Sequence, residues 1–155
     1  MLSFSPCKIN IGLNIINKRI DGYHNLETLF YPVYFIKDIV EVVPASNDKD
    51  SYGFSGIPIS SELNDNLCVK TINLLRKHYK FPNIELYLHK NVPMGAGLGG
   101  GSANVATIIN LIDKLFNFKM SLSEKIHLSG SLGSDCAFFI EAKPSIGYEK
   151  GNVLS

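Results

Sequence analysis

A glycine-rich run is the part of this sequence with the most recognisable chemistry. Five glycines lie within Pro93-Met-Gly-Ala-Gly-Leu-Gly-Gly-Gly101, after the alternating segment 84–89, which we expect to be a strand. Ser102 follows, and we expect it to cap and open a helix. Repeated glycine lets several backbone N–H groups converge, and a helix N-terminus adds about half a positive charge. The residues predict a cradle for a di- or triphosphate, with an ordinary strand-to-helix connection as the alternative.

The residues of this run do not assign it to one class of phosphate loop. A Walker motif needs Gly-Lys-Ser/Thr at its end, and the lysine is missing here. The spacing Gly95-x-Gly97-x-x-Gly100 matches a dinucleotide fingerprint, but the acidic residue expected about 20 residues later is absent, where the chain is still helical. No His-Arg-Asp or Asp-Phe-Gly of a protein kinase follows. An oxidoreductase therefore stays a distant alternative.

A second candidate surface lies near the N-terminus, in the alternating segment 8–15. Its apolar residues Ile9, Ile11, Leu13 and Ile15 share one face of an expected strand, and Lys8, Asn10, Gly12 and Asn14 share the other. Burying a lysine and two asparagines without partners would be costly. We therefore expect this polar face to point at solvent or at a ligand.

Composition limits the partners of the 155-residue chain. With 15 Lys and Arg against 14 Asp and Glu, it has no net field to attract nucleic acid or an anionic membrane, so we expect neither as a partner. The N-terminus lacks the pattern of a signal peptide. Three cysteines without a CxxC pair indicate reducing cytosol, and we expect a cytoplasmic protein. Neither cysteine nor histidine spacing predicts a metal-ligand cluster.

Alternating and helical patterns predict the elements that position these residues. Residues 18–22 read as a turn, Tyr23–Ile36 and Ile39–Val43 as β-rich, and Pro44–Ser61 as a loop. Asn64 or Asp65 can cap a helix that begins near Leu67, and Ser121 with Glu124 forms a capping box for a later helix. The tail 137–150 reads as strand, turn and strand. Strands that precede helices in this way indicate the α+β class.

Three segments together make the sequence resemble the GHMP kinases, the superfamily of galactose, homoserine, mevalonate and phosphomevalonate kinases. Residues 93–103 are similar to the ATP-binding motif of that superfamily. Pro6-Cys-Lys-Ile-Asn-Ile-Gly-Leu13 with Asp21-Gly-Tyr-His24, and Leu132-Gly-Ser-Asp135, resemble the branch that phosphorylates 4-diphosphocytidyl-2-C-methyl-D-erythritol in non-mevalonate isoprenoid biosynthesis. Cys7 and Cys136 depart from that pattern, where alanine and valine are usual.

The resemblance implies a fold and a domain organisation. The implied fold is the GHMP-kinase N-terminal domain, which is ribosomal protein S5 domain 2-like, with a mixed sheet packed on helices. We expect residues 1–155 to form this ATP-binding domain, and the C-terminal GHMP domain to be absent from this chain. The implied cofactors are ATP and Mg²⁺, and the implied partner is the small-molecule substrate. The sequence does not indicate an oligomeric state.

The resemblance also implies a role for individual residues. Asp135 matches the general base, and Lys8 the lysine that keeps this aspartate ionised and stabilises the developing alkoxide. Without the resemblance, the simpler interpretation of these residues is favoured: an aspartate that serves a helix start and a strand lysine with a solvated head group. The implied substrate-binding residues are Asn10, Tyr23, His24 and Phe30. The implied nucleotide-binding residues are Pro93, Met94, Gly95, Ala96, Gly97, Leu98, Gly99, Gly100, Gly101, Ser102, Ala103, Asn66 and Lys90.

Two other functions remain open at this point. The chain could be a nucleotide-binding module without turnover, or a GHMP kinase that acts on another small molecule. Asp21-Gly-Tyr-His24 argues against the second, because in this superfamily it is the cytidine-recognising feature.

Overall fold

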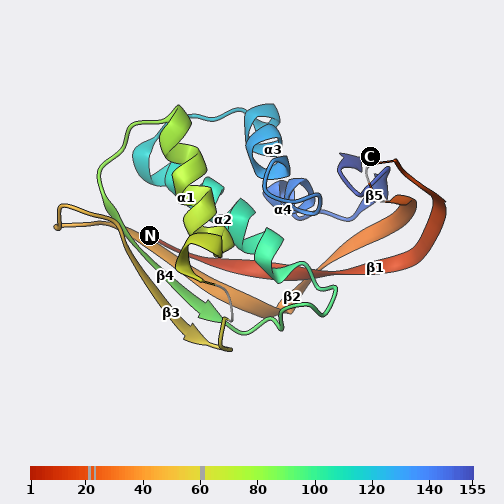
Figure 1. Ribbon diagram of the computed structural model, residues 1–155, viewed down its shortest axis with the longest axis horizontal. Helices are drawn as coiled ribbons and strands as arrows, with labels where there is room; N and C mark the ends of the chain where they lie inside the picture. The colour runs from red at the N-terminus through yellow and green to blue at the C-terminus, as the bar shows by residue number, and fades with distance from the viewer. Residues whose placement is uncertain (21, 23, 60–61) are drawn as a thin grey trace.

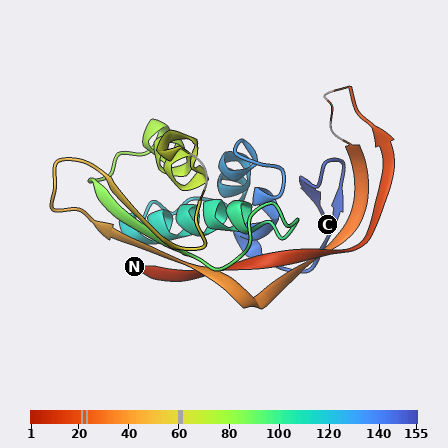
Figure 2. The same cartoon turned by 60° about the horizontal axis from the view of Figure 1, so that its bottom comes forward.

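The computed structural model describes residues 1–20, 22, 24–59 and 62–155, and these residues fold into two layers. A mixed sheet forms one layer, and the helices lie together on one of its faces (Figures 1 and 2). The strands are β1 (Leu2–Lys18), β2 (His24–Pro44), β3 (Ser51–Gly56), β4 (Ile84–Lys90), β5 (Ser145–Tyr148) and β6 (Val153–Leu154). The helices are the 3₁₀ turn η1 (Leu63–Asp65), α1 (Leu67–His78), α2 (Gly100–Phe116), α3 (Leu122–Gly130) and α4 (Cys136–Glu141). The predicted α+β class and mixed sheet are confirmed.

β2 pairs with three other strands of the sheet, β1, β4 and β5. The strand order is β3-β4-β2-β5-β6, and β1 also pairs with β2; the pairs are antiparallel except for the parallel pair β3–β4. The register between β1 and β2 shifts at Pro6/Cys7, where β2 turns away from β4. Beyond that point the two strands form a long arm that curves past the C-terminal strands (Figure 2).

The core lies between the sheet and α2. β4 alternates, with Ile84, Leu86 and Leu88 turned inward and fully or nearly fully buried. α2 presents Val105, Ile108, Ile109 and Ile112 to the same layer, and each is fully buried. Burying one such side chain contributes roughly 1.5–3 kcal/mol. This packing fixes β4 and α2 relative to each other, and therefore both ends of the glycine run that connects them.

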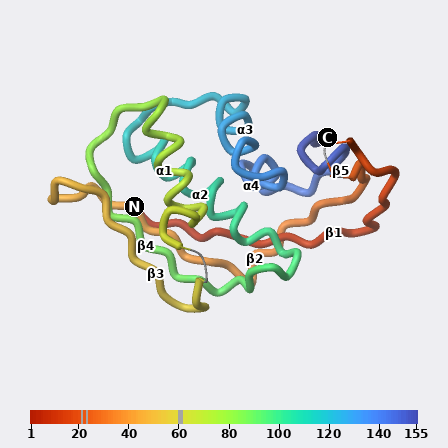
Figure 3. Tube along the Cα trace, in the orientation of Figure 1, coloured from red at the N-terminus to blue at the C-terminus, as the bar shows by residue number. Residues whose placement is uncertain are grey.

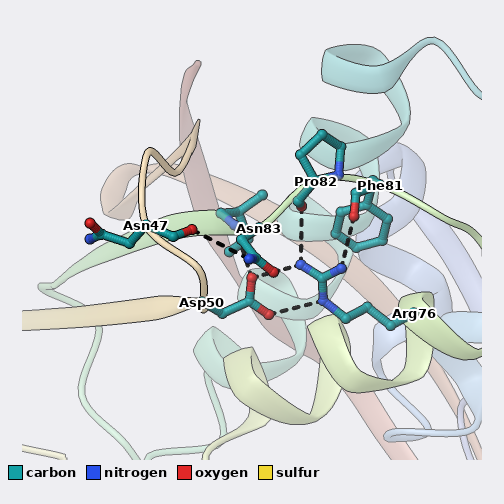
Figure 4. Close-up of polar contacts among 7 residues, drawn as sticks. Asn47, Asp50, Arg76, Phe81, Pro82 and Asn83 are labelled. Carbon is teal, nitrogen blue, oxygen red and sulfur yellow. Dashed lines mark hydrogen bonds and ion pairs between the residues drawn. The ribbon is translucent and has the colours of Figure 1, made fainter.

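Arg76 fixes the end of β4 that lies far from the glycine run (Figure 4). Its guanidinium contacts both carboxylate oxygens of Asp50, at 2.9 and 2.6 Å, and donates to the carbonyls of Phe81 and Pro82. Asp50 Oδ1 also accepts the amide of Ile84, the first residue of β4, at 2.9 Å. The contacts tie the start of β3, the end of α1 and the start of β4 together.

Helix starts agree with the sequence in one case and differ in two. The capping box of Ser121 and Glu124 at α3 is confirmed. α1 is capped by Asn66, whose side chain accepts the amide of Cys68 at 2.8 Å, and not by Asn64 or Asp65, because those residues belong to the preceding 3₁₀ turn. α2 begins at Gly100 rather than Ser102: Gly99 is its N-cap, with φ 68°, and supplies no side-chain cap.

Strand predictions fail where pairing partners are distant or an apolar run is ambiguous. The loop expected over Pro44–Ser61 contains β3, which forms through parallel pairing with β4. The strand expected after Asp135 is α4, because its run of apolar residues packs against α2 and α3 instead of joining the sheet. The two β-rich segments before Pro44 form one strand, β2.

Candidate active site

Lys8 of β1 and Asp135, just before α4, meet across the molecule. Lys8 Nζ lies 3.2 Å from Asp135 Oδ2, and it donates to Asn10 Oδ1 at 2.5 Å. The ammonium also lies 5.0 Å above the centre of the Phe30 ring. The Lys8 side chain is only 6% exposed, so its charge is compensated inside the protein, whereas the Asp135 side chain is 30% exposed. The predicted meeting of these two residues is confirmed.

The Asp135 carboxylate is not used as a helix cap. Asp135 occupies the N-cap position of α4, but its side chain makes no capping hydrogen bond there. The alternative that this aspartate serves the helix start is therefore excluded by its geometry. One carboxylate oxygen faces Lys8, and the partial exposure of the side chain leaves the group accessible to a small molecule.

The glycine run lies directly beside this pair. The carbonyl of Leu98 accepts the amide of Lys8 at 2.9 Å, so the run is tied to β1 at the residue that carries the ammonium. A Cβ atom at Gly99 would lie 2.8 Å from the Phe139 ring and 3.2 Å from Lys8 Cε, so only glycine fits there. The connection between β4 and α2 can be followed in Figure 3. The predicted proximity of this bend to Lys8 and Asp135 is confirmed.

The outer part of the run is open. Gly95 and Gly97 have φ values of 71° and 73°, and a Cβ atom on either would meet nothing within 4 Å. Residues 93–102, with Leu67 at the edge, line a surface hollow of about 280 Å³. The first amides of α2 point toward this end of the helix without a side-chain cap. Open amides at a helix N-terminus suit a polyphosphate.

A second hollow of about 230 Å³ adjoins the run on its α1 side. Its lining includes Asn66, Lys90, Met94 and Gly101, all expected near a nucleotide, together with Asn104 of α2. Asn104 is 2% exposed, and its Oδ1 has no hydrogen-bond partner. A buried acceptor without a partner fits a ligand with an N–H donor. Asn104 is not among the predicted site residues, although an asparagine within an apolar helix face is a visible signal.

The remaining site residues have varied surroundings. His24 is exposed at the start of β2, opposite Lys18 in the arm, and Tyr23 lies outside the described residues. Phe30 is 1% exposed and packs against Phe138, and its ring lies under the Lys8 ammonium. Its expected contact with the substrate stays a prediction. Ala103 is fully buried in the core.

Ser102 lies in the first turn of α2 and is linked to the residue after Asp135. Its hydroxyl hydrogen-bonds the Cys136 thiol. Burial raises the pKa of that thiol to about 11, and the hydrogen bond partly offsets this rise.

In the part of the chain that the structure describes, no three His, Cys, Asp or Glu side chains gather as metal ligands would. Of the helices in the same residues, none is both long and apolar enough to span a membrane.

Curated relatives match the whole chain. A 4-diphosphocytidyl-2-C-methyl-D-erythritol kinase of Cytophaga hutchinsonii is 43% identical over 155 residues, which is 100% of this chain and 56% of the relative. The kinase of the same name from Bacteroides fragilis is 43% identical over 157 residues, with 100% of this chain and 57% of the relative covered. This chain spans about half the length of these curated relatives.

Solved structures agree in fold. A crystal structure of 4-(cytidine 5'-diphospho)-2C-methyl-D-erythritol kinase superposes with a TM-score of 0.82 at 29% identity, covering 100% of this chain and 54% of that one. A phosphomevalonate kinase of Streptococcus pneumoniae gives a TM-score of 0.67 at 14% identity, over 98% of this chain and 49% of that one. The second likeness concerns the fold alone.

The family described as GHMP kinases N terminal domain matches residues 66–143, just over half of this chain. This range contains the glycine run, the whole of α2 and Asp135. The chain therefore belongs to the GHMP kinases.

Proposed function

We propose that this chain is the N-terminal, ATP-binding domain of a kinase that phosphorylates the C2 hydroxyl of 4-diphosphocytidyl-2-C-methyl-D-erythritol. The names of relatives that match the chain from end to end support this substrate. Because the chain spans about half of each relative, the complete activity requires the remaining length of such a protein. The observation that carries the proposal is the ion pair of Lys8 with Asp135 beside the glycine run.

The chemistry assigned to this pair follows from its charges. Phosphoryl transfer needs positioning, charge stabilisation and a group that accepts the hydroxyl proton. Asp135 accepts the proton of the C2 hydroxyl as that oxygen attacks the γ-phosphorus. Lys8 holds the carboxylate in place at 3.2 Å and stabilises the negative charge that develops on the oxygen. Asn10 and the Phe30 ring restrict the ammonium to this position.

The nucleotide is held by the glycine run and the adjoining hollow. The open amides near Gly95 and Gly97 and at the start of α2 bind the phosphates, and Ser102 adds a hydroxyl at the same helix end. Asn66, Lys90 and Asn104 line the hollow, and Asn104 Oδ1 has no hydrogen-bond partner, which fits a base with N–H donors. ATP would supply the phosphoryl group; Mg²⁺, which the Ser102 hydroxyl would help to hold, would offset the negative charge of the phosphates.

The second substrate lies along the arm. Tyr23 and His24 stack on and read the cytosine base, in line with their match to the cytidine-recognising motif; stacking of a base on an aromatic ring contributes about 1–3 kcal/mol. Asn10 lies on the same strand face as Lys8 and hydrogen-bonds the substrate or orders the lysine.

Removing the Asp135 carboxylate tests the assignment. In the full-length protein, Asp135→Ala is expected to lower kcat by at least ~10²-fold, because a positioned base is lost. The dissociation constant for ATP should stay within about threefold, since the phosphate cradle is untouched. Turnover is measured as ADP release with the cytidine substrate, and ATP binding by calorimetry.

Glu141→Gln is the control for this experiment. Glu141 also pairs with a lysine, Lys143 at 2.8 Å, but on an exposed surface away from both hollows, so turnover should be unchanged. An Asp135→Ala enzyme with wild-type kcat would remove Asp135 from the role of base. A wild-type protein that phosphorylates another sugar or polyol, and not the cytidine substrate, would point to a different GHMP kinase.

A nucleotide-binding module without turnover is the second candidate, and the half-length coverage of the relatives favours it for the 155 residues by themselves. Calorimetry with ATP–Mg²⁺ and with a cytidine diphosphate separates the two. Binding of ATP without phosphoryl transfer by the full-length protein would support the module.

A further inference from the structure

Asp38 of β2 is a buried carboxylate that no feature of the proposed chemistry uses. Its side chain is fully buried and pairs with Lys90, whose side chain is 3% exposed, at 2.5 Å. Its other oxygen accepts the amides of Asn91 and Val92, at 2.7 and 2.8 Å. All of these contacts go to three consecutive residues, 90–92. One carboxylate thereby fixes the direction in which the chain leaves β4 for the glycine run.

Lys90 breaks the apolar pattern of β4. The inward positions before it are occupied by Ile84, Leu86 and Leu88, and a fourth aliphatic residue would need no partner. Replacing a buried ion pair with apolar side chains is often neutral or stabilising. Core stability therefore does not account for a lysine and an aspartate at this place.

The surroundings of Lys90 indicate what the pair does instead. Its ammonium lies beside the first residue of α2, because a Cβ atom on Gly100 would be 2.9 Å from Lys90 Nζ. Lys90 also lines the hollow of about 230 Å³, and Asn104 of α2 is another of its lining residues. A helix N-terminus is itself positive, so an ammonium there is unfavourable unless a negative group holds it. Asp38 is that group.

We infer that Asp38 is a positioning residue for nucleotide binding, which acts through Lys90 and through the amides of Asn91 and Val92. The inference rests on the proposed function, because it takes the hollow and the glycine run as the nucleotide site. Asp38 does not touch the nucleotide. It fixes the lysine at the hollow and the first residues of the run before the ligand arrives, so that neither has to be ordered on binding.

Asp50 provides a matched control for a test. It too is an aspartate that pairs with a cation and accepts a backbone amide at one end of β4, but at the end away from the glycine run. In the full-length protein, Asp38→Asn is expected to raise the dissociation constant and the KM for ATP by about tenfold, as one charge-assisted hydrogen bond is lost. The kcat and the KM for the cytidine substrate should stay within about threefold. Asp50→Asn should leave all four constants within about twofold.

The measurements are made at a temperature where circular dichroism shows both variants folded. Equal changes in the two variants, or an unchanged ATP constant in Asp38→Asn, would overturn the inference. If Asp38→Asn does not fold, the double variant Asp38→Asn, Lys90→Met replaces it, because it leaves no unpaired buried charge; wild-type ATP affinity in that variant would overturn the inference as well.

The wild-type protein separates this inference from the proposed function. Wild-type binding of ATP with no loss in Asp38→Asn removes only the role of Asp38. A wild type that binds no ATP removes both.

Discussion

The two ends of β4 are held by the same kind of contact but in different surroundings. At its start, Asp50 accepts the amide of Ile84 and pairs with Arg76, and at its end Asp38 accepts two amides and pairs with Lys90. The Arg76 and Asp50 side chains are 27% and 17% exposed, whereas those of Lys90 and Asp38 are 3% and 0% exposed. Water can therefore replace a lost partner at the first end and not at the second.

The cations differ as much as the burial. The Arg76 guanidinium donates hydrogen bonds to one carboxylate and two backbone carbonyls, all of which belong to loop residues (Figure 4). It also lies over the Phe81 ring, which adds a cation–π contact. Lys90 contacts one carboxylate and otherwise faces a hollow. The Arg76–Asp50 pair therefore connects loops to one another, whereas the Lys90–Asp38 pair fixes a lysine side chain beside a hollow.

Truncating each aspartate gives the largest expected contrast. Asp38→Ala leaves Lys90 buried without its carboxylate, and the free energy of unfolding should fall by about 3–5 kcal/mol. Asp50→Ala should cost about 1–3 kcal/mol, because the partly exposed guanidinium of Arg76 can be solvated. Urea unfolding followed by circular dichroism measures both. Similar losses at the two ends would mean that burial does not distinguish them.

Removing both charges at each end sharpens the contrast. Asp38→Asn with Lys90→Met is expected to unfold within about 1 kcal/mol of the wild type, since no buried charge remains unpaired. Asp50→Asn with Arg76→Met should stay about 2 kcal/mol below it, because the carbonyls of Phe81 and Pro82 lose their donor. Urea unfolding measures both double variants. If the Arg76 double variant, and not the Lys90 one, regained the stability of the wild type, the contrast between the two ends of β4 would be the opposite of the one expected.

The smallest expected effect is a change in the pKa of the Cys68 thiol when the Asp38 charge is removed. Burial raises the pKa of this thiol to about 12; Lys90 lowers it in part, and Asp38 raises it further. The thiolate is the reactive form, so the native protein should react with iodoacetamide very slowly at pH 8. Asp38→Asn removes a contribution that raises the pKa and should speed labelling of Cys68 by less than about tenfold. Labelling is followed by mass spectrometry.

Asp50→Asn is again the control, because neither Asp50 nor Arg76 is among the main causes of the shift in the pKa of Cys68. Equal acceleration in both variants would indicate general loosening rather than a change of charge beside the thiol.

Local signals explain which parts of this molecule the sequence could predict. The glycine run, the helical stripe of α2 and the capping box are short-range patterns, and each appears in the structure. The meeting of Lys8 with Asp135 came from the resemblance, since no local rule joins residues so far apart. Their chemical roles stay predictions.

The missed features depend on distant partners. β3 lacks strong alternation and exists through its pairing with β4. The start of α2 was misplaced by two residues because a left-handed glycine, rather than the nearby serine, ends the loop. Asp38 falls between the two segments predicted as β-rich, and Lys90 directly follows the alternating segment 84–89, so only the fold shows that these two charges pair.

Gly12 has a consequence for solubility. Among the described residues, β2 is the only strand that pairs with β1, and the other edge of β1 carries no strand beyond Lys8, whose amide bonds the Leu98 carbonyl. In that part of β1 the side chains of Ile9, Ile11 and Ile15 are 42%, 48% and 61% exposed. An apolar strand edge of this kind is a template for strand addition between molecules. Gly12 has φ 67°, and the register slips between Ile11 and Asn14. The resulting bulge interrupts the edge in its middle and bends the strand, which disfavours a second chain continuing the ladder past it.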